Sequence, residues 1–114
     1  MDRSELLSSL KLDRFIAFDF ETTGLQVETD RAIEVAAIMF KDGKPAEKFV
    51  TLINPQIPIS DLIADITGIT NEMVAEAPLE KEIIDDLFEF LGDYPIVAHN
   101  TPFDLSFLRA MAER

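Results

Sequence analysis

Apolar residues in the first half of the chain fall into runs that are typical of β-strands. Residues 15–21 are apolar at almost every position until acids appear near the end of the run, which predicts a buried central strand. Residues 32–40 form a second β-rich run, and Asp42-Gly43 soon after it is the strongest short turn signal in the sequence. Residues 47–53 are then expected to return as a third strand. The pattern predicts an antiparallel meander of three strands.

Helical spacing follows two prolines that break the strand pattern. Residues 60–68 predict a helix that begins after a Ser N-cap and stops at a Gly. Residues 71–74 predict a short further turn capped by Asn71. A longer helix is expected near residues 78–92, ending at Gly92. Its apolar stripe is formed by Ile83, Ile84, Leu87, Phe88 and Leu91.

The C-terminal part repeats the change from strand to helix. Residues 96–99 form a short apolar strand, and Thr101-Pro102 predicts the start of a last helix, with Thr101 as N-cap and Pro102 at the first helical position. A strand that follows a helical crossover pairs parallel to the first strand, so this one is expected at the edge of the sheet. Leucines in residues 4–12 indicate a short surface helix. The fold class is therefore α/β, a single domain over residues 1–114 whose mixed sheet has flanking helices.

The composition and net charge exclude several classes of function. A chain of 114 residues suits one domain, and its net charge of −12, without any basic tract, excludes binding of nucleic acid by simple charge complementarity. Nucleic-acid chemistry that runs through metal cations stays open. The absence of cysteine excludes disulfides, zinc thiolates and thiol nucleophiles. No apolar run approaches the roughly 20 residues of a membrane span, so we expect a soluble cytoplasmic protein with no membrane partner.

Two acids at the end of the first strand are the first candidates for chemistry. Asp19 and Glu21 point to the same face of a strand, about 6.5 Å apart along it. Their mutual repulsion is costly without a cation, and a hard divalent cation with oxygen ligands would relieve it. Thr22-Thr23-Gly24 follows at once, offering hydroxyls, backbone N–H groups and a glycine able to take positive φ. Spacing alone also fits a strand that leaves the core with its acids in solvent, since the Asp-x-Glu pattern is common.

Polar residues near the last helix are the second group of candidates. Residues 101–104 fit a capping box in which Asp104 at the third helical position complements the helix dipole. His99 and Asn100 follow the fourth strand, where polar groups of α/β sheets often meet ligands. Taken in isolation, His99 also fits a satisfied near-core histidine, and Asn100 also fits a turn residue. Local spacing leaves these alternatives open.

Three segments together resemble one enzyme family. Residues 15–25 resemble the first motif of the DEDD exonuclease superfamily, and residues 97–108 are similar to its second motif. Residues 65–74 look like the linker helix of its DEDDh-type branch, the proofreading exonucleases that resemble the epsilon subunit of DNA polymerase III. The matches occur in the right order and cover residues 15–112. The resemblance implies a ribonuclease-H-like fold and 3′→5′ exonuclease activity on DNA or RNA.

The resemblance also implies a role for individual residues. Asp19, Glu21 and Asp104 match the catalytic, metal-binding acids of the family, which hold two Mg²⁺ or Mn²⁺ ions for hydrolysis of the scissile phosphate. The implied partner is the 3′ end of single-stranded DNA or RNA. The residues that match the family's substrate-binding positions are Thr22, Thr23, Leu25, Asn100 and Phe103.

The family's third motif has no counterpart in this sequence. That motif supplies a general-base histidine and a further aspartate, or a tyrosine in another branch, whereas this sequence ends ten residues after Asp104. His99 is the only histidine and matches the second motif. We therefore expect a truncated domain lacking a fifth strand and a closing helix, and a chain that by itself is inactive or weakly active.

Other interpretations stay open at this stage. A non-catalytic module could keep the exonuclease fold and bind nucleic-acid ends or another protein. The uncovered apolar edge strand could pair with another chain and give self-association. A flavodoxin-type phosphate-binding domain fits less well, because no Gly-rich loop follows the first strand. The sequence does not separate DNA from RNA, nor a proofreading subunit from a polymerase- or helicase-fused domain or a stand-alone exonuclease.

Overall fold

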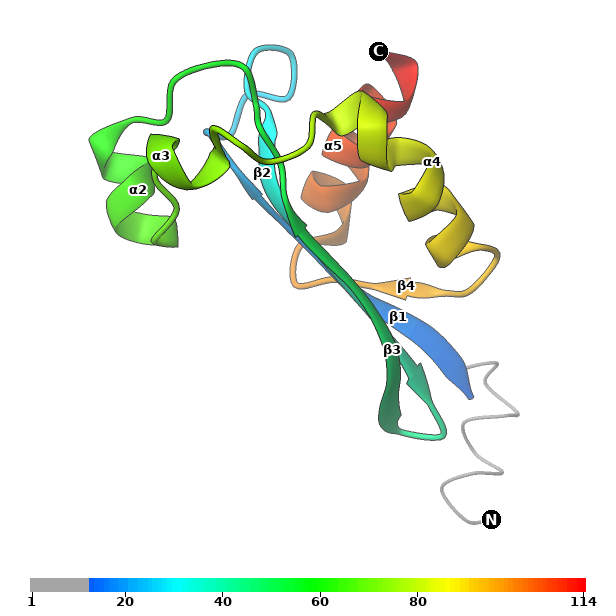
Figure 1. Ribbon diagram of the computed structural model, residues 1–114. Coiled ribbons are helices and arrows are strands. Elements are labelled where there is room, and N and C mark those ends of the chain that lie inside the picture. Colours follow the sequence, from blue (N-terminus) through cyan, green and yellow to red (C-terminus); the bar gives the residue numbers. More distant parts are fainter. Residues whose placement is uncertain (1–12) are drawn as a thin grey trace.

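The computed structural model describes residues 13–114. The helix expected over residues 4–12 lies outside this part. The described elements, in chain order, are β1 (Arg14–Thr22), β2 (Ala32–Lys41), β3 (Lys44–Leu52), α2 (Asp61–Thr67), α3 (Asn71–Val74), α4 (Glu80–Leu91), β4 (Ile96–Val97) and α5 (Thr101–Glu113) (Figure 1). Within this part, no helix is both long and apolar enough to cross a lipid bilayer.

The sheet has the predicted mixed topology. The strand order is β3-β2-β1-β4, with β1–β2 and β2–β3 antiparallel. β4 pairs parallel to β1 through Ile16↔Ile96 and Ala17↔Val97, at one edge of the described sheet. β4 is shorter than the predicted strand over residues 96–99. The meander, the parallel strand and its edge position are confirmed.

The hairpin between β2 and β3 follows directly from its two turn residues. Asp42 and Gly43 both take positive φ, at 52° and 82°, as a type I′ turn requires. Such a turn lets pairing resume at once, so Lys44 already pairs with Lys41. β3 therefore begins three residues before the predicted start, because the turn chemistry rather than the apolar run decides the boundary.

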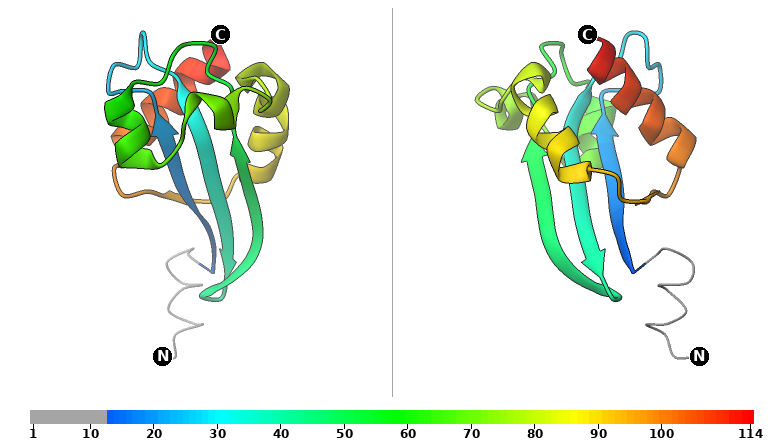
Figure 2. Two further views of the ribbon diagram at one scale, coloured as in Figure 1. Left: turned by 60° about the vertical axis from the view of Figure 1, so that its left-hand side comes forward. Right: turned by 90° about the vertical axis from the view of Figure 1, so that its right-hand side faces the viewer.

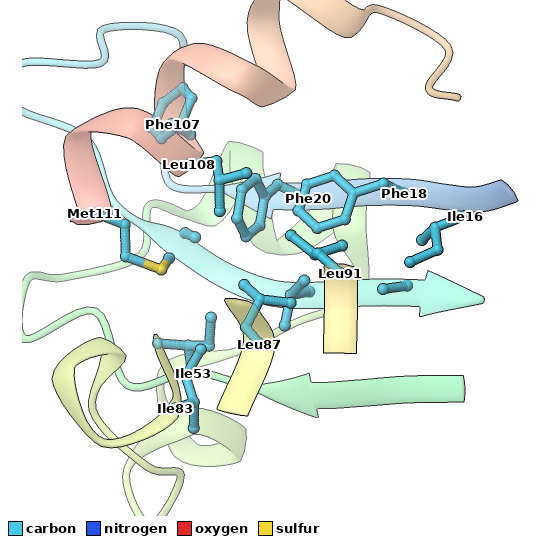
Figure 3. Close-up of a cluster of buried hydrophobic side chains, with 13 residues drawn as sticks. Ile16, Phe18, Phe20, Ile53, Ile83, Leu87, Leu91, Phe107, Leu108 and Met111 are labelled. Atoms are coloured by element: carbon cyan, nitrogen blue, oxygen red, sulfur yellow. The ribbon is translucent and has the colours of Figure 1, made fainter. Parts of the chain in front are cut away.

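The main core lies between one face of the sheet and helices α4 and α5 (Figure 2). Alternate residues of β1 point into it, since successive side chains of a strand face opposite sides. Burying each large apolar side chain contributes about 1.5–3 kcal/mol. The buried cluster consists of Ile16, Phe18, Phe20, Ala32, Val35, Ala37, Ile53, Ile83, Leu87, Leu91, Phe107, Leu108 and Met111 (Figure 3).

Helices α2 and α3 lie on the opposite side of the sheet from α4 and α5 (Figure 1). A register shift between Glu21 and Thr22 leaves Ile33 as an extra residue of β2. Ile33 is fully buried in a second, smaller cluster with Ile59, Ile69 and Val74. The bulge therefore lets one strand contribute to two cores, and α2 and α3 cover the sheet close to the end of β1.

Two local details differ from the sequence prediction. Thr70, not Asn71, caps α3, because the Asn71 side chain instead donates to the Ile59 carbonyl at 3.0 Å and accepts from the Ile59 N–H at 2.8 Å. Phe88 was expected in the apolar stripe of α4, yet 43 % of it is exposed. The buried stripe of α4 is narrower, with Ile83, Leu87 and Leu91 at strict four-residue spacing.

Candidate functional site

Asp19 and Glu21 lie on the face of β1 that points away from the main core. Their neighbours Phe18 and Phe20 are 3 % and 4 % exposed on the core face, whereas Asp19 is exposed and Glu21 is half-buried. Glu21 pairs directly with Glu34 of β2, which places another acid opposite it. The predicted shared face of the two acids is thus confirmed, and like charges crowd it.

Asp104 comes to the same strand from the first turn of α5. Its side chain is 3 % exposed, and its Oδ1 accepts a hydrogen bond of 3.0 Å from the backbone N–H of Phe20. Phe20 lies between Asp19 and Glu21. The bond joins residues 84 positions apart in the chain, so only the tertiary fold brings the three motif acids to one strand end.

The short edge strand explains why a carboxylate occupies this place. Further back along β1, the Ile16 N–H donates to the Pro95 carbonyl just before β4. β4 ends at Val97, and the Phe20 N–H lies on the same edge of β1, because N–H groups two and four residues apart in a strand share an edge. Asp104 therefore replaces the strand that would otherwise accept this hydrogen bond.

The capping-box interpretation of residues 101–104 is wrong. Asn100 is the N-cap of α5, and its side-chain oxygen accepts from the Phe103 N–H at 3.4 Å. Thr101 is already helical, and its hydroxyl donates to the Ala98 carbonyl. Helix α5 begins one residue earlier than predicted, so Asp104 falls one position beyond a capping box and bonds to β1 instead.

The acids interact electrostatically. The pKa of Glu21 is raised by burial above all, and then by Asp19, Glu34 and Asp104. The pKa of Asp104 is also raised, mainly by burial and further by Asp19, although the Phe20 N–H and His99 oppose the shift. The ion pair among the described residues is formed by Arg114 and Glu80. Within this part of the chain, therefore, Asp19, Glu21, Glu34 and Asp104 form no salt bridge with a basic side chain. The strand end therefore carries uncompensated negative charge.

The carboxylates of Asp19, Glu21 and Asp104 at the end of β1 are suited to a hard divalent cation, since carboxylate oxygens are the ligands that Mg²⁺ and Mn²⁺ prefer. A cation there would offset the repulsion that, after burial, raises the pKa of Glu21 and Asp104. Within residues 13–114, however, no three His, Cys, Asp or Glu side chains approach closely enough to form a metal cluster by themselves. The described acids thus offer the donor chemistry that a hard cation prefers, without a complete ligand set among residues 13–114.

The loop after β1 is tightly hydrogen-bonded within itself. The Thr22 hydroxyl donates to the Gly24 carbonyl at 2.6 Å, and the Thr23 hydroxyl donates to Asp30 at 2.9 Å. Gly24 is able to take a positive φ, but among the described glycines positive φ occurs at Gly43, Gly68 and Gly92. Leu25, next along the chain, is 80 % exposed. Both threonine hydroxyls are thus engaged inside the loop, which leaves Leu25 as its prominent exposed apolar side chain.

His99, Asn100 and Phe103 lie around the start of α5. His99 is exposed, so the near-core alternative for it is wrong, and it lines a shallow groove together with Asp19 and Val97. Asn100 is exposed although its side chain caps the helix. Phe103 is half-buried and packs against Phe107 with ring centroids 5.0 Å apart. Asn100 and Phe103 therefore have structural contacts at the border of the candidate site.

Sequence reasoning missed Asp30. This residue accepts hydrogen bonds from the Thr23 hydroxyl and the Gln26 N–H, both at 2.9 Å. The available signal was an Asp close to the end of a short polar loop, where its carboxylate can bond to nearby backbone groups. Spacing alone does not reveal which loop atoms it reaches.

Comparisons with curated proteins find polymerases. The chain is 44 % identical over 100 residues to DNA polymerase III PolC-type from Caldanaerobacter subterraneus subsp. tengcongensis and 42 % identical over 99 residues to the same enzyme from Bacillus subtilis. These matches cover 88 % and 87 % of this chain. The chain spans only 7 % of the length of either relative.

Comparisons with solved structures find exonucleases. Exonuclease X in complex with 5′ overhanging duplex DNA matches with a TM-score of 0.70 and 34 % identity, over 82 % of this chain and 53 % of that one. Exonuclease I matches with a TM-score of 0.78 over 89 % of this chain and 24 % of that one, but at 22 % identity this likeness shows the fold alone. The mixed sheet with flanking helices is thus the predicted ribonuclease-H-like fold.

The family itself follows from the profile of the exonuclease family RNase_T, which matches residues 16–114 and includes Asp19, Glu21 and Asp104. The resemblance of the three sequence motifs to exonucleases is confirmed. This chain belongs to the exonuclease family.

Proposed function

We propose that this chain forms the greater part of a metal-dependent 3′→5′ exonuclease domain that acts on DNA. The observation that carries the proposal is the hydrogen bond from the Phe20 N–H to Asp104, because it joins the second-motif acid to the backbone of the residue between Asp19 and Glu21. DNA is favoured over RNA since the curated relatives are DNA polymerases and exonuclease X is seen with duplex DNA. A replication-linked, proofreading role in the cytoplasm would follow from the PolC relationship.

In this proposal the three acids hold divalent cations at the end of β1. Asp19 and Glu21 supply carboxylates from one face of the strand, and Asp104 contributes from α5. Two Mg²⁺ or Mn²⁺ ions, when bound, supply Lewis-acid stabilisation of the scissile phosphate and of its leaving oxygen. Cations also explain how a chain of net charge −12 can hold a polyanion at the reacting bond.

The substrate side of the proposal rests on the residues around these acids. The exposed Leu25 would contact the last base, while backbone groups of Thr22 and Thr23 would lie near the 3′-hydroxyl. Asn100 and Phe103, at the start of α5, would border the path of the strand. The partner is then the 3′ end of a single strand.

The proposal includes low activity of this chain in isolation. His99 is its only histidine and belongs to the second motif, so the sequence offers no general base at a third-motif position. Loss of general-base catalysis alone costs about 10²–10⁴-fold in rate. A second chain that pairs with the edge strand β4 could complete the site, which makes self-association part of the proposal.

The test is a nuclease assay on 5′-labelled single-stranded DNA with Mn²⁺, together with Mn²⁺ binding measured by calorimetry. Asp19→Ala is the site variant, and Asp85→Ala, an exposed acid on α4, is the matched control for lost charge. We expect Mn²⁺ binding that Asp19→Ala weakens and Asp85→Ala leaves unchanged, with little cleavage. Rapid shortening from the 3′ end, lost only in Asp19→Ala, would contradict the predicted low activity and indicate a site completed by self-association.

A non-catalytic module that binds nucleic-acid ends or a protein is the second candidate. It is favoured by the lack of a three-ligand cluster among residues 13–114. Such a module has no need of a cation at the three acids. Absence of Mn²⁺ binding, combined with DNA-end binding that Asp19→Ala leaves intact, would support this candidate and reject the exonuclease.

A further inference from the structure

The loop over residues 23–31 is closed around a single carboxylate. The Thr23 hydroxyl donates to Asp30 Oδ1 at 2.9 Å, and the Gln26 backbone N–H donates to Oδ2 at 2.9 Å. The ends of the loop are joined as well, because the Thr23 N–H donates to the Arg31 carbonyl at 2.8 Å and the Arg31 N–H donates to the Thr23 hydroxyl at 3.0 Å. Asp30 therefore connects the beginning, the middle and the end of this loop.

Gly24 lies directly against this carboxylate. A Cβ atom at Gly24 would lie 2.8 Å from Asp30 Cγ and 2.9 Å from Oδ1, with Oδ2 closer still. The far end of a side chain can usually move aside, but both oxygens of Asp30 are held by hydrogen bonds. Glycine is thus needed at position 24 because it leaves room for Asp30, not because of its backbone conformation.

The same loop contacts anchor the backbone on both sides of Leu25. On one side, the Gly24 carbonyl accepts from the hydroxyl of Thr22, which is 8 % exposed and follows Glu21 on β1. On the other side, the Gln26 N–H is bound to Asp30. Leu25 is 80 % exposed, and its backbone is anchored on both flanks. An anchored backbone presents a side chain in one direction, which is what a specific binding site requires.

We infer that Asp30 is a positioning residue for the 3′-terminal nucleotide. Its carboxylate keeps residues 23–26 in the shape that presents Leu25 and the loop backbone beside the acids of β1. Asp30 acts through Thr23, Gly24 and Gln26 rather than by touching the nucleotide. This inference rests on the proposed exonuclease function and adds a residue outside the metal-binding acids.

The test compares two DNA ends. Dissociation constants are measured by fluorescence anisotropy, with Mn²⁺, for one single-stranded oligonucleotide ending in a 3′-hydroxyl and for the same strand ending in a 3′-phosphate. A phosphorothioate at the terminal linkage prevents cleavage. We expect wild type to prefer the 3′-hydroxyl, and Asp30→Ala to bind that end about tenfold more weakly, as the loss of two orienting hydrogen bonds implies. Binding of the 3′-phosphate strand should change little.

Two further variants separate positioning from simple loss of charge. Glu28→Ala removes an exposed acid from the same loop and should keep the wild-type preference. Asp30→Asn should keep more of the preference for the 3′-hydroxyl end than Asp30→Ala does. Its amide oxygen can still accept from the Thr23 hydroxyl, whereas its NH₂ group cannot accept from the Gln26 N–H.

A double-mutant cycle tests the contact with Gly24. Gly24→Ala should weaken binding of the 3′-hydroxyl end in the wild-type background, because the new methyl group displaces the carboxylate. In the Asp30→Ala background the same methyl group has space, so Gly24→Ala should cause little further loss. Additive effects of the two substitutions would contradict the proposed contact.

The outcomes distinguish this inference from the proposed function. If wild type and Glu28→Ala discriminate the two ends and Asp30→Ala does so equally well, the positioning role is rejected while the exonuclease proposal stands. If Asp30→Ala weakens both strands alike and lowers the melting temperature, the role is merely structural and the inference is again rejected. If wild type itself binds no 3′ end, the proposed function fails, and the positioning role fails with it.

Discussion

The two faces of β1 differ sharply in what surrounds them. On the core face, Ile16, Phe18 and Phe20 are at most 4 % exposed and belong to one buried cluster with residues of α4 and α5. On the other face, Asp19 is exposed, and Glu21 is half-buried opposite Glu34. Because side chains alternate along a strand, one segment of the chain supplies both a core and a charged site. Substitutions on the two faces should therefore have different signatures.

The largest effect is expected on the core face. Phe107 of α5 is 1 % exposed, and Phe107→Ala should lower the free energy of unfolding by about 3–5 kcal/mol, because it removes a buried ring and leaves a cavity. Phe88→Ala is the control, since 43 % of Phe88 is exposed, and it should cost far less. Urea unfolding followed by circular dichroism measures both. Equal losses for the two variants would contradict the assigned core.

A cation should stabilise the acidic face. If Mn²⁺ binds the folded protein at Asp19 and Glu21, a concentration one hundred times the dissociation constant adds about 2.7 kcal/mol to the free energy of unfolding. The increase should vanish in Asp19→Ala and persist in Asp85→Ala. Thermal unfolding with and without Mn²⁺ measures this effect. A melting temperature that Mn²⁺ leaves unchanged would contradict a cation site.

Asp104 links the two faces and should respond to substitution in an unusual way. Asp104→Ala leaves the Phe20 N–H without its acceptor and should cost about 1–3 kcal/mol. Asp104→Asn keeps an oxygen that can accept the Phe20 hydrogen bond, and it removes the negative charge. Burial raises the pKa of Asp104, which means that the charged form is unfavourable in the folded protein. Asp104→Asn should therefore be at least as stable as wild type at neutral pH without metal. Comparing the two variants by urea unfolding tests the assignment. Equal destabilisation would show that the charge, rather than the hydrogen bond, matters.

The smallest effect concerns pH. Burial and neighbouring acids raise the pKa of Glu21 in the folded protein, so the folded chain retains a proton at pH values where the unfolded chain has lost it. The stability contributed by this group is therefore present below the ordinary pKa and decreases as the pH rises to the raised folded pKa. Glu21→Gln should flatten this part of the curve and be more stable than wild type at neutral pH.

Unfolding measured across the mildly acidic range, without metal, tests this prediction. Glu28→Gln, an exposed acid in the following loop, is the control and should follow the wild-type curve. Superimposable curves for Glu21→Gln and wild type would reject an unfavourable environment for Glu21.

Features that depend on neighbouring residues could be predicted from the sequence. The alternation of β1 placed Asp19 and Glu21 on one face, and Asp42-Gly43 specified the hairpin through its positive φ angles. Helix α2 begins after Ser60 and ends before Gly68 as expected, because capping depends on atoms only a few residues apart. Boundaries were less predictable, since pairing extended β3 to Lys44 and α5 began at Thr101.

By itself, the sequence determined the α/β class, the order of the elements, the family resemblance and the shared face of the two acids on β1, since each of these depends on local spacing or on motifs. Only the tertiary structure decided the position of Asp104, which local spacing had assigned to a helix cap. It also decided the packing of Asp30 against Gly24. Both carboxylates accept hydrogen bonds from backbone N–H groups that do not belong to the regular pattern of their own helix or loop. The spacing of residues along the sequence does not show which of these N–H groups the folded chain brings within reach.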